Sequence, residues 1–433
     1  MNKYDSYKDS GIEWIGKIPS HWKVTKLKFI GNIICGGTPS TTNEEYWTGN
    51  IPWIQSGKVQ NNIVLLDVVD KKITENALVE SSTKLVKKDS VLIAITGATC
   101  SNIGYLTFET AVNQSIVAVE PSNFNSVLLF NLLKSQKEQI LFHQSGGAQG
   151  GVTKGDMMNI YIPYPTVEEQ ITIANYLDQK TTQIDDLIAK KENLIRLQEE
   201  ERTAMINQAV TKGLDPTVPM KDSGIEWLGE IPAHWEVKRI GHVTKVVRGA
   251  SPRPAGDPFL FNGDFLPWIT VKEVTNAEGK YIVSTETCLT EEGSKNTRII
   301  EPETLLLSNS GATLGVPRIT KIKGGINDGS VAFFNLQIER DYLYYFFITH
   351  TKIYREEVSG YGQPNLNTDI VKSTKIALPN KKEQLKIVIF IEKHLEKFED
   401  LKIKTQQEIE LLKEYKTVLI SEVVTGKVDV RNE

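Results

Sequence analysis

The feature that most constrains this chain is an internal repeat. Residues 8–24, KDSGIEWIGKIPSHWKV, return as residues 221–237, KDSGIEWLGEIPAHWEV, with 13 of 17 positions identical and no gap. Because the chain has 433 residues, each copy occupies about half of it, which is far longer than the units of a solenoid. The sequence therefore predicts two similar halves related by a pseudo-two-fold axis, each presenting an equivalent surface.

Matched positions extend the repeat over the whole chain. Their offset is 213 residues near the start of each copy (222 − 9 = 213) and 214 further on (311 − 97 = 214). The matched segments are Gly36 and Pro39 with Gly249 and Pro252, residues 97–99 with 311–313, Glu169-Gln170 with Glu383-Gln384, and Val210-Thr211 with Val424-Thr425. By contrast, residues 55–90 and 270–300 share almost nothing. This pattern indicates one scaffold that reads two different targets, and neutral drift of surface loops is the alternative.

Composition excludes several classes of protein. With 40% apolar residues the chain can bury large cores, and its length predicts about two to four domains. It has no apolar run of 18 residues and no targeting pattern at its start, so we expect a cytoplasmic protein. Cys35, Cys100 and Cys288 lack the spacing of a disulfide framework or a zinc site, which predicts free thiols. The net charge of −4 counts against nucleic-acid binding unless basic side chains are segregated.

Each copy predicts an α+β domain followed by one long helix. Short β-type runs precede a helix near residues 125–142 in the first copy and 340–357 in the second. Apolar residues then recur at helical spacing from Glu168 to about Thr211, and an equivalent stripe runs from Ile391 to Val423. The expected division is a globular domain with the repeat motif at residues 1–165, a central helix at 166–212, a second globular domain with the second motif at 213–380, and a C-terminal helix at 381–433.

A helix of about 40 residues with one narrow apolar stripe is stable only against a partner helix. We therefore expect the two long helices to pack together as an antiparallel coiled coil. Polar residues interrupt the stripes at Lys191, Gln198, Arg202, Lys402 and Lys416. Two interpretations stand for them: they face a different protein, or they are the ordinary polar interruptions of a coiled coil.

Signatures of catalysis are absent from the sequence. No Gly-Lys pair is followed by Ser or Thr, and the G-x-S-x-G, H-E-x-x-H and Asn/Asp-Pro-Pro-aromatic motifs do not occur. We therefore expect no enzyme activity and no catalytic, metal-binding or cofactor-binding residues in this chain. The repeated I-P-x-H-W motif, with Trp14 and Trp22 in one copy and Trp227 and Trp235 in the other, is interpreted as a small structural core.

Four motifs occur together in each copy. They are D-S-G-I-E-W-x-G-x-I-P-x-H-W, a Gly-Gly-Thr-Pro-Ser or Gly-Ala-Ser-Pro turn, Gly-Ala-Thr, and Pro-x-x-x-Glu-Gln at the entry to the long helix. In this combination the chain resembles the specificity subunit of a Type I DNA restriction-modification system, over essentially all of residues 1–430. The resemblance implies a non-catalytic DNA reader whose two globular domains are target recognition domains. It also implies a bipartite target, with two half-sites separated by a gap that the helical spacer sets.

The resemblance further implies which partners assemble on the chain. Double-stranded DNA is the target, and the long helices dock two methyltransferase subunits, which bind S-adenosylmethionine and modify adenine. Restriction subunits that translocate DNA then join, and no membrane is involved. The alternative is a duplicated coiled-coil adaptor that binds proteins rather than DNA. The low basic charge favours that alternative, whereas the polar loops argue against it.

Polar, Gly-rich loops that recur in both copies are the expected DNA-reading surface. Asn and Gln side chains suit adenine edges and Arg and Lys suit guanine, although Gly, Asn and Ser also build ordinary turns. The candidates in the first copy are Thr38, Ser40, Gln55, Ser56, Lys58, Thr96, Thr99, Asn113, Gln114 and Gln149. Those in the second copy are Arg248, Ser251, Arg253, Thr270, Lys272, Asn309, Ser310, Thr313, Asn327, Tyr361, Gln363, Asn365 and Asn367.

Overall fold

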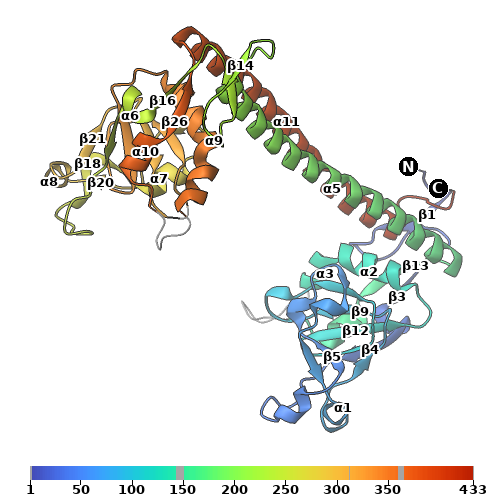
Figure 1. Cartoon of the computed structure of the whole chain (residues 1–433). Coiled ribbons are helices and arrows are strands. Elements are labelled where there is room, and N and C mark those ends of the chain that lie inside the picture. The colour runs from blue at the N-terminus through green and yellow to red at the C-terminus, as the bar shows by residue number, and fades with distance from the viewer. Residues whose placement is uncertain (1, 143–150, 312, 359–364, 433) are drawn as a thin grey trace. The chain divides into compact units, whose positions relative to one another are not determined.

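The computed structural model describes residues 2–142, 151–311, 313–358 and 365–432 (Figure 1). Contacts divide the chain into two compact units, Met1–Glu192 with Gln406–Glu433, and Asn193–Thr405. We call these unit 1 and unit 2. Each unit contains one globular α+β domain and part of both long helices, whereas the sequence alone suggests boundaries at the helix ends. None of the helices in the described ranges is long and apolar enough to cross a membrane.

Unit 1 is built on two sheets. The larger has the strand order β4-β12-β9-β10-β6, with β4 at Gly31–Cys35, β12 at Ile116–Pro121, β9 at Val91–Ala94, β10 at Ile103–Leu106 and β6 at Ile63–Val64. The smaller has the order β7-β5-β11-β8, with β7 at Lys71–Ile73, β5 at Ile51–Ile54, β11 at Thr110–Val112 and β8 at Leu85–Val86. Because side chains alternate along a strand, Val91 and Ile93 of β9 enter one core, and Leu92 and Ala94 enter another.

Unit 2 repeats this topology strand for strand. Its larger sheet has the order β17-β25-β22-β23-β19, with β17 at Lys245–Arg248, β25 at Ser330–Phe334, β22 at Leu305–Ser308, β23 at Pro317–Thr320 and β19 at Tyr281–Ile282. Its smaller sheet has the order β20-β18-β24-β21, with β20 at Cys288–Leu289, β18 at Phe261–Ile269, β24 at Gly324–Ile326 and β21 at Arg298–Ile300. The duplication seen in the sequence is therefore a duplication of the sheets.

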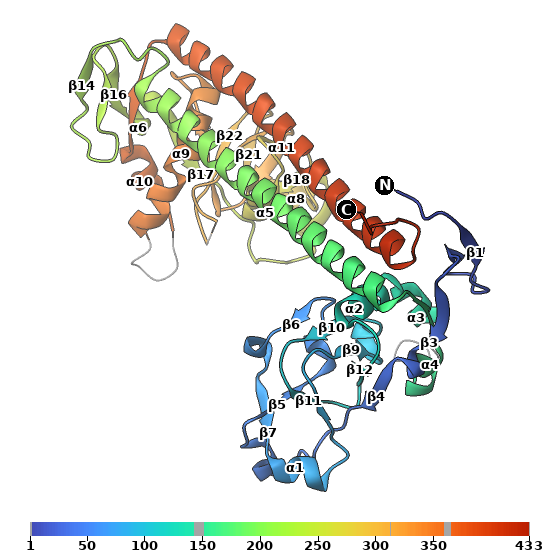
Figure 2. The ribbon, with the colours of Figure 1, turned by 90° about the vertical axis from the view of Figure 1, so that its right-hand side faces the viewer.

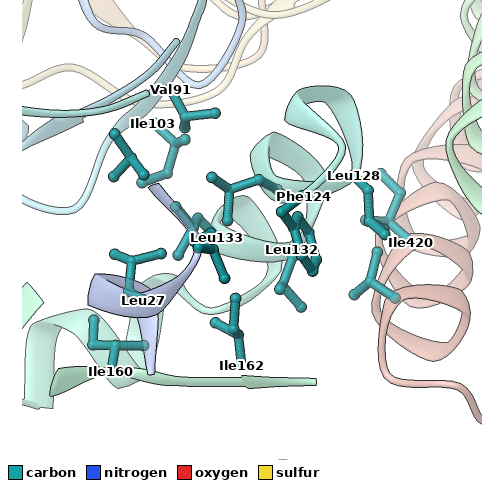
Figure 3. Close-up of a cluster of buried hydrophobic side chains, with 14 of the residues drawn as sticks. Leu27, Val91, Ile103, Phe124, Leu128, Leu132, Leu133, Ile160, Ile162 and Ile420 are labelled. Atoms are coloured by element: carbon teal, nitrogen blue, oxygen red, sulfur yellow. The ribbon is translucent and has the colours of Figure 1, made fainter. Parts of the chain in front are cut away.

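A helix covers the larger sheet in each unit, but the two helices differ. In unit 2 it is continuous, as α9 (Arg340–Val358), whereas in unit 1 it is divided into α2 (Ser126–Ser135) and α3 (Lys137–Phe142). The expectation of one helix over residues 125–142 is therefore wrong. The backbone N–H of Gln136 bonds to Leu133 O, three residues back, which tightens the last turn of α2 and ends it. Figure 3 shows Leu128 of α2 beside Ile420 of the C-terminal long helix, and Leu132 belongs to the same buried cluster.

The two long helices lie where the apolar stripes predict them, and the second ends before residue 433. They are α5 at Val167–Lys212, with 46 residues, and α11 at Lys381–Val424, with 44 residues. In unit 1, α5 lies beside α11 (Figure 2), with Leu177 and Ile184 in the same buried cluster as Leu419 and Val423. Apolar residues of the two helices also share a single core in unit 2.

The charged residues that interrupt the helical stripes form ion pairs inside the units. In unit 1, Lys416 pairs with Asp185 at 2.6 Å and Lys191 with Glu408 at 2.5 Å, so the two helices run in opposite directions there. In unit 2, Glu199 accepts from Lys402 at 2.8 Å and from Arg202 at 3.2 Å. Gln198 is buried, and neither of its amide atoms has a hydrogen-bond partner among the described residues. These contacts favour the second interpretation, in which the polar residues belong to the helix pair.

The aromatic residues of the repeated motif behave differently from one another. Trp22 and Trp235 are fully buried, as expected of a structural core. Trp14 is only half-buried at the margin of the unit 1 core, and Trp227 is 36% exposed. The structural core of the motif is therefore centred on the second tryptophan of each copy.

Candidate functional site

The topology of unit 1 brings the candidate loops to one edge of its sheets. Strands β5 and β11 are parallel, with Ile54 opposite Val112, so their carboxyl ends meet. The loop that starts at Gln55 therefore lies beside Asn113, whose N–H donates to Ile54 O at 2.9 Å. We call this edge, with the loops that follow β4, β5, β9 and β11, loop edge 1.

Two further loops join loop edge 1. Gly36, after β4, approaches so closely that a Cβ there would lie 2.1 Å from Asn113 O, which explains why the position needs glycine. The chain then places Thr38 against Gln114, where the threonine hydroxyl donates to the amide oxygen. After β9, Thr96 forms a β-bridge with Gly151. Separate stretches of sequence thus form one continuous polar edge.

Unit 2 builds an equivalent edge, loop edge 2, from the ends of β17, β18, β22 and β24. A Cβ on Gly249 would lie 2.1 Å from Asn327 O, which repeats the close approach of Gly36 to Asn113. The N–H of Asn327 donates to Ile269 O at 3.1 Å. Ser310, after β22, forms a β-bridge with Asn365. The backbone frame is therefore the same in both units.

Most of the described candidate residues lie at the surface of these edges. In unit 1, Ser40, Gln55, Thr96 and Gln114 are exposed, and Thr38, Ser56, Lys58, Thr99 and Asn113 are half-buried. In unit 2, Arg248, Arg253, Lys272, Thr313, Asn365 and Asn367 are exposed, and Ser251, Thr270, Ser310 and Asn327 are half-buried. The candidates Gln149, Tyr361 and Gln363 lie outside the described residues.

Asn309 does not belong to the surface of loop edge 2. Its side chain is fully buried, because its backbone lies between Gly329 and Leu366, which it bonds at 2.9 and 2.7 Å. Neither of its amide atoms has a hydrogen-bond partner in the described part of the chain. The equivalent residue of the first copy is Ile95, which is also buried. An Asn next to a surface turn looks accessible in the sequence, but here the strand carries it inward.

Two candidates fit the alternative interpretation of the loops, in which polar side chains stabilise local backbone structure and do not contact DNA. Thr270 is the N-cap of α7 (Val271–Asn276), and its side chain accepts from Lys272 N–H at 3.2 Å. Asn367 is the N-cap of α10 (Thr368–Ser373), and its side chain accepts from Asp369 N–H at 2.9 Å. Such caps stabilise helix starts by about 1 kcal/mol each. Both side chains therefore have a structural function in the free chain.

The two edges differ in charge. In loop edge 2, the carboxylate of Asp328 accepts from Ser251 Oγ at 2.6 Å and from Arg253 Nη2 at 3.4 Å, while Arg248 Nε donates to Asp328 O at 2.7 Å. The position equivalent to Asp328 in loop edge 1 is Gln114, which is neutral. Asp328 therefore gathers two guanidinium groups on its edge. The sequence places Asp328 in the same candidate loop as Asn327, but it does not show that Arg248 and Arg253 meet it.

Two lysine candidates are neutralised within their own units. Lys58 pairs with Asp70 at 3.1 Å, and this hydrogen bond holds the pKa of the Asp70 carboxyl below its usual value. Lys272 pairs with Glu286 at 2.6 Å, which raises the pKa of the lysine. Exposed pairs of this kind contribute little to stability, so both lysines can exchange their partner for another anion. The side chain of Arg253 is 70% exposed although it pairs with Asp328.

Comparison with known proteins also divides the chain into two similar parts. Residues 19–197 and 232–411 each match the family described as Type I restriction modification DNA specificity domain. The MjaIX specificity subunit of a Type I restriction enzyme from Methanocaldococcus jannaschii is 28% identical over 437 residues, which covers 96% of this chain and 95% of the relative. The EcoR124I/EcoR124II specificity subunit from Escherichia coli is 28% identical over 184 residues, 41% of this chain and 43% of that protein.

Two solved structures share the fold of this chain. One comes from work on complex assembly and conformational transition of the type I R-M system; it aligns with a TM-score of 0.72 at 16% identity and covers 95% of this chain and 99% of its own. The other is the HsdS subunit from Thermoanaerobacter tengcongensis, with a TM-score of 0.59 at 15% identity, covering 95% of this chain and 98% of its own.

Proposed function

The chain belongs to the Type I restriction modification DNA specificity family, and from this premise we propose that it reads a bipartite DNA target without catalysing a reaction itself. The observation that carries the proposal is the pair of loop edges. Each unit builds the same backbone frame from equivalent strand ends and places different side chains on it. Two different readers on one chain suit a target made of two different half-sites.

The side chains of the edges suit base recognition. Loop edge 1 exposes Gln55 and Gln114, whose amide groups match the donor and acceptor pattern of adenine. Loop edge 2 exposes Arg248 and Arg253, whose guanidinium groups match guanine. The two half-sites should therefore differ in base composition.

The long helices are proposed to act as the spacer between the two readers, packed as an antiparallel coiled coil with pseudo-two-fold symmetry. A helix of 46 residues is about 69 Å long, which corresponds to about two turns of B-form DNA. The same helices would dock two methyltransferase subunits, which bring S-adenosylmethionine, and restriction subunits would join that complex. Partner subunits that close around the DNA would also supply phosphate contacts, which accounts for a reader with a net charge of −4.

The direct test is to purify the chain with the methyltransferase subunit of its own host and to measure binding to a random DNA library at low and high salt. We expect enrichment of one bipartite sequence and weaker binding at high salt, because each phosphate contact releases counterions. Substituting Arg253→Met should weaken binding by roughly tenfold to a hundredfold through one half-site only. Lys295→Met, at an exposed lysine paired with Glu292 outside the loop edges, is the matched control. Failure to enrich any sequence would favour the protein-binding adaptor.

A further inference from the structure

Two of the sequence features matched between the copies, the I-P-x-H-W motif and the Pro-x-x-x-Glu-Gln entry, meet in the structure. In unit 1, Glu169 Oε1 lies 2.8 Å from His21 Nε2, and Trp22 Nε1 donates to Glu169 Oε2 at 3.2 Å. In unit 2, Glu383 lies 3.0 Å from His234 Nε2 and accepts from Trp235 Nε1 at 2.9 Å. Both glutamates are in the first turn of a long helix.

The glutamine that follows each glutamate binds a third segment. Gln170 Oε1 accepts from the N–H of Asn125, the N-cap of α2, at 2.8 Å. Gln384 Oε1 accepts from the N–H of Glu339, directly before α9, at 2.8 Å. Each Glu-Gln pair therefore connects the repeated motif, the helix that covers the large sheet, and the first turn of the long helix. We call each of these assemblies a clamp.

The unit 1 clamp is buried, whereas in the unit 2 clamp the side chain of Glu383 is 25% exposed. Glu169, Gln170 and Gln384 are at most 6% exposed, and Trp22 and Trp235 are fully buried. Burial raises the pKa of the Glu169 carboxyl, but hydrogen bonds from His21, Trp22 and Thr166 outweigh burial and leave that pKa below its usual value. An ionised carboxylate only accepts hydrogen bonds, so His21 must carry its proton on Nε2.

Apolar packing holds the domain to its helix less specifically. Leu128, Leu132 and Ile420 share one buried cluster (Figure 3), and packing of this kind depends on buried area rather than on direction. A buried, charge-assisted hydrogen bond depends on the angle and distance of its partners, and leaving one unmade costs free energy. The clamp is therefore a directional contact between each domain and its own helix, and in unit 2 the hydroxyl of Tyr342, which donates to Val210 O at 2.8 Å, is another.

We propose that Glu169 and Glu383 are positioning residues that set the direction of each loop edge relative to its helix, and thereby the length of the gap between the two half-sites. This inference rests on the proposed function. A change of angle that displaces a loop edge by about 3.4 Å along DNA would shift its half-site by one base pair. The duplication supports this role, because both copies keep the clamp residues while their reading loops differ.

The test uses the complete chain with its methyltransferase subunit, in the variants Glu169→Gln, Glu383→Gln and the double variant. Glutamine has the size of the native glutamate, but it has one oxygen and one amide nitrogen. The nitrogen cannot accept a hydrogen bond, so either the histidine or the tryptophan N–H of the clamp loses its acceptor. Methylation is measured on a panel of duplexes with the same half-sites and stepwise shorter and longer gaps. We expect methylation of gaps one base pair from the optimum to rise roughly tenfold relative to the optimum, with unchanged base preference in each half-site. Glu168→Gln and Glu396→Gln, at exposed positions of the same helices, are the controls.

A purely structural clamp would give a different result. It would lower the unfolding temperature of the variants and leave their gap preference unchanged, and that outcome would overturn the inference while the proposed function stands. Trp22→Phe and Trp235→Phe keep an aromatic side chain, although a smaller one, and remove the indole N–H donor, so they should broaden the gap preference in the same direction even if the Gln variants fold poorly. A wild-type complex without any bipartite preference would instead refute the proposed function, and the inference with it.

Discussion

The two units reach the same local structure at the end of a long helix by different routes of the chain. In unit 2 the backbone continues from α5 through Gly213 into the second repeat motif. In unit 1 the segment after α11 is joined to the N-terminal segment by non-covalent contacts: Asp429 N–H donates to Asn2 O at 2.9 Å, and the Arg431 guanidinium lies 4.8 Å from the ring of Tyr4. The structure at the end of each long helix therefore depends on packing against the repeat motif. It does not depend on whether the chain connects the helix directly to that motif.

The glycines that follow the two long helices, each beside the second tryptophan of a repeat motif, give the sharpest test of this comparison. Gly426 and Gly213 have φ values of 72° and 76°, so alanine costs about 1–2 kcal/mol of unfolding free energy at either site. At Gly426 a Cβ would also lie 2.5 Å from Pro19 Cδ, whereas at Gly213 its nearest neighbour is Trp235 Cζ2 at 3.2 Å. We expect Gly426→Ala to destabilise unit 1 by about 3 kcal/mol or more, and Gly213→Ala to destabilise unit 2 by less.

Hydrogen exchange measured separately for each unit would resolve these two effects. If the two variants lost the same unfolding free energy in their respective units, the packing around the motif in unit 1 would have to adapt to a methyl group. The segment between residues 426 and 432 would then be less constrained than its contacts with the N-terminal segment indicate.

A second difference between the units is acid sensitivity. His350 of α9 is buried against Trp227, Phe346 and Tyr354, and burial lowers its pKa from 6.5 to about 4. The equivalent residue of unit 1 is Gln136, which does not titrate. Below pH 6.5 the unfolded chain binds a proton that the folded unit 2 does not, so the stability of unit 2 falls as the pH drops toward 4.

We expect His350→Gln to remove this contribution, which is on the order of 2 kcal/mol at pH 5. The measurement is the free energy of unfolding of each unit between pH 7 and 4. The free energy of unfolding of unit 2 should depend less on pH in the variant than in the wild type, while that of unit 1 should be unaffected. If the slope of unfolding free energy against pH were unchanged in the variant, groups other than His350 would dominate the acid response of unit 2.

The smallest expected difference concerns the ion pairs between the long helices. Lys416 is 22% exposed and pairs with Asp185, whereas Lys402 is 46% exposed and pairs with Glu199. Burial and the nearby charge of Lys416 lower the pKa of Lys134. Removing Lys416 therefore also removes the repulsion between these two lysines. We expect Lys416→Met and Lys402→Met each to cost less than about 1 kcal/mol of unfolding free energy.

Urea unfolding of each variant at low and high salt would check this expectation. The cost of Lys402→Met should shrink more at high salt, because its pair is more exposed to screening ions. A cost above about 2 kcal/mol for either lysine would show that the pair is more strongly coupled than a surface salt bridge.

The sequence by itself determined the features that depend on local pattern. Helical periodicity over residues 168–211 predicted α5 to within about one residue at each end, and the offset of the repeat predicted that Gly36 and Gly249 occupy equivalent places. These predictions succeed because periodicity and glycine conformation act over a few neighbouring residues.

Only the tertiary structure decided which distant residues meet. Glu169 bonds to Trp22 across 147 positions of sequence, and although the repeat matches Glu169 with Glu383, the sequence does not indicate that Glu169 meets Trp22. Likewise, pairing of β22 with its neighbours turns Asn309 inward, and Asp328 gathers Arg248 and Arg253 only because β17 and β24 end at the same edge. Strand pairing joins residues far apart in the chain, so the burial and partners of a polar side chain follow from the assembled sheets and not from its neighbours in sequence.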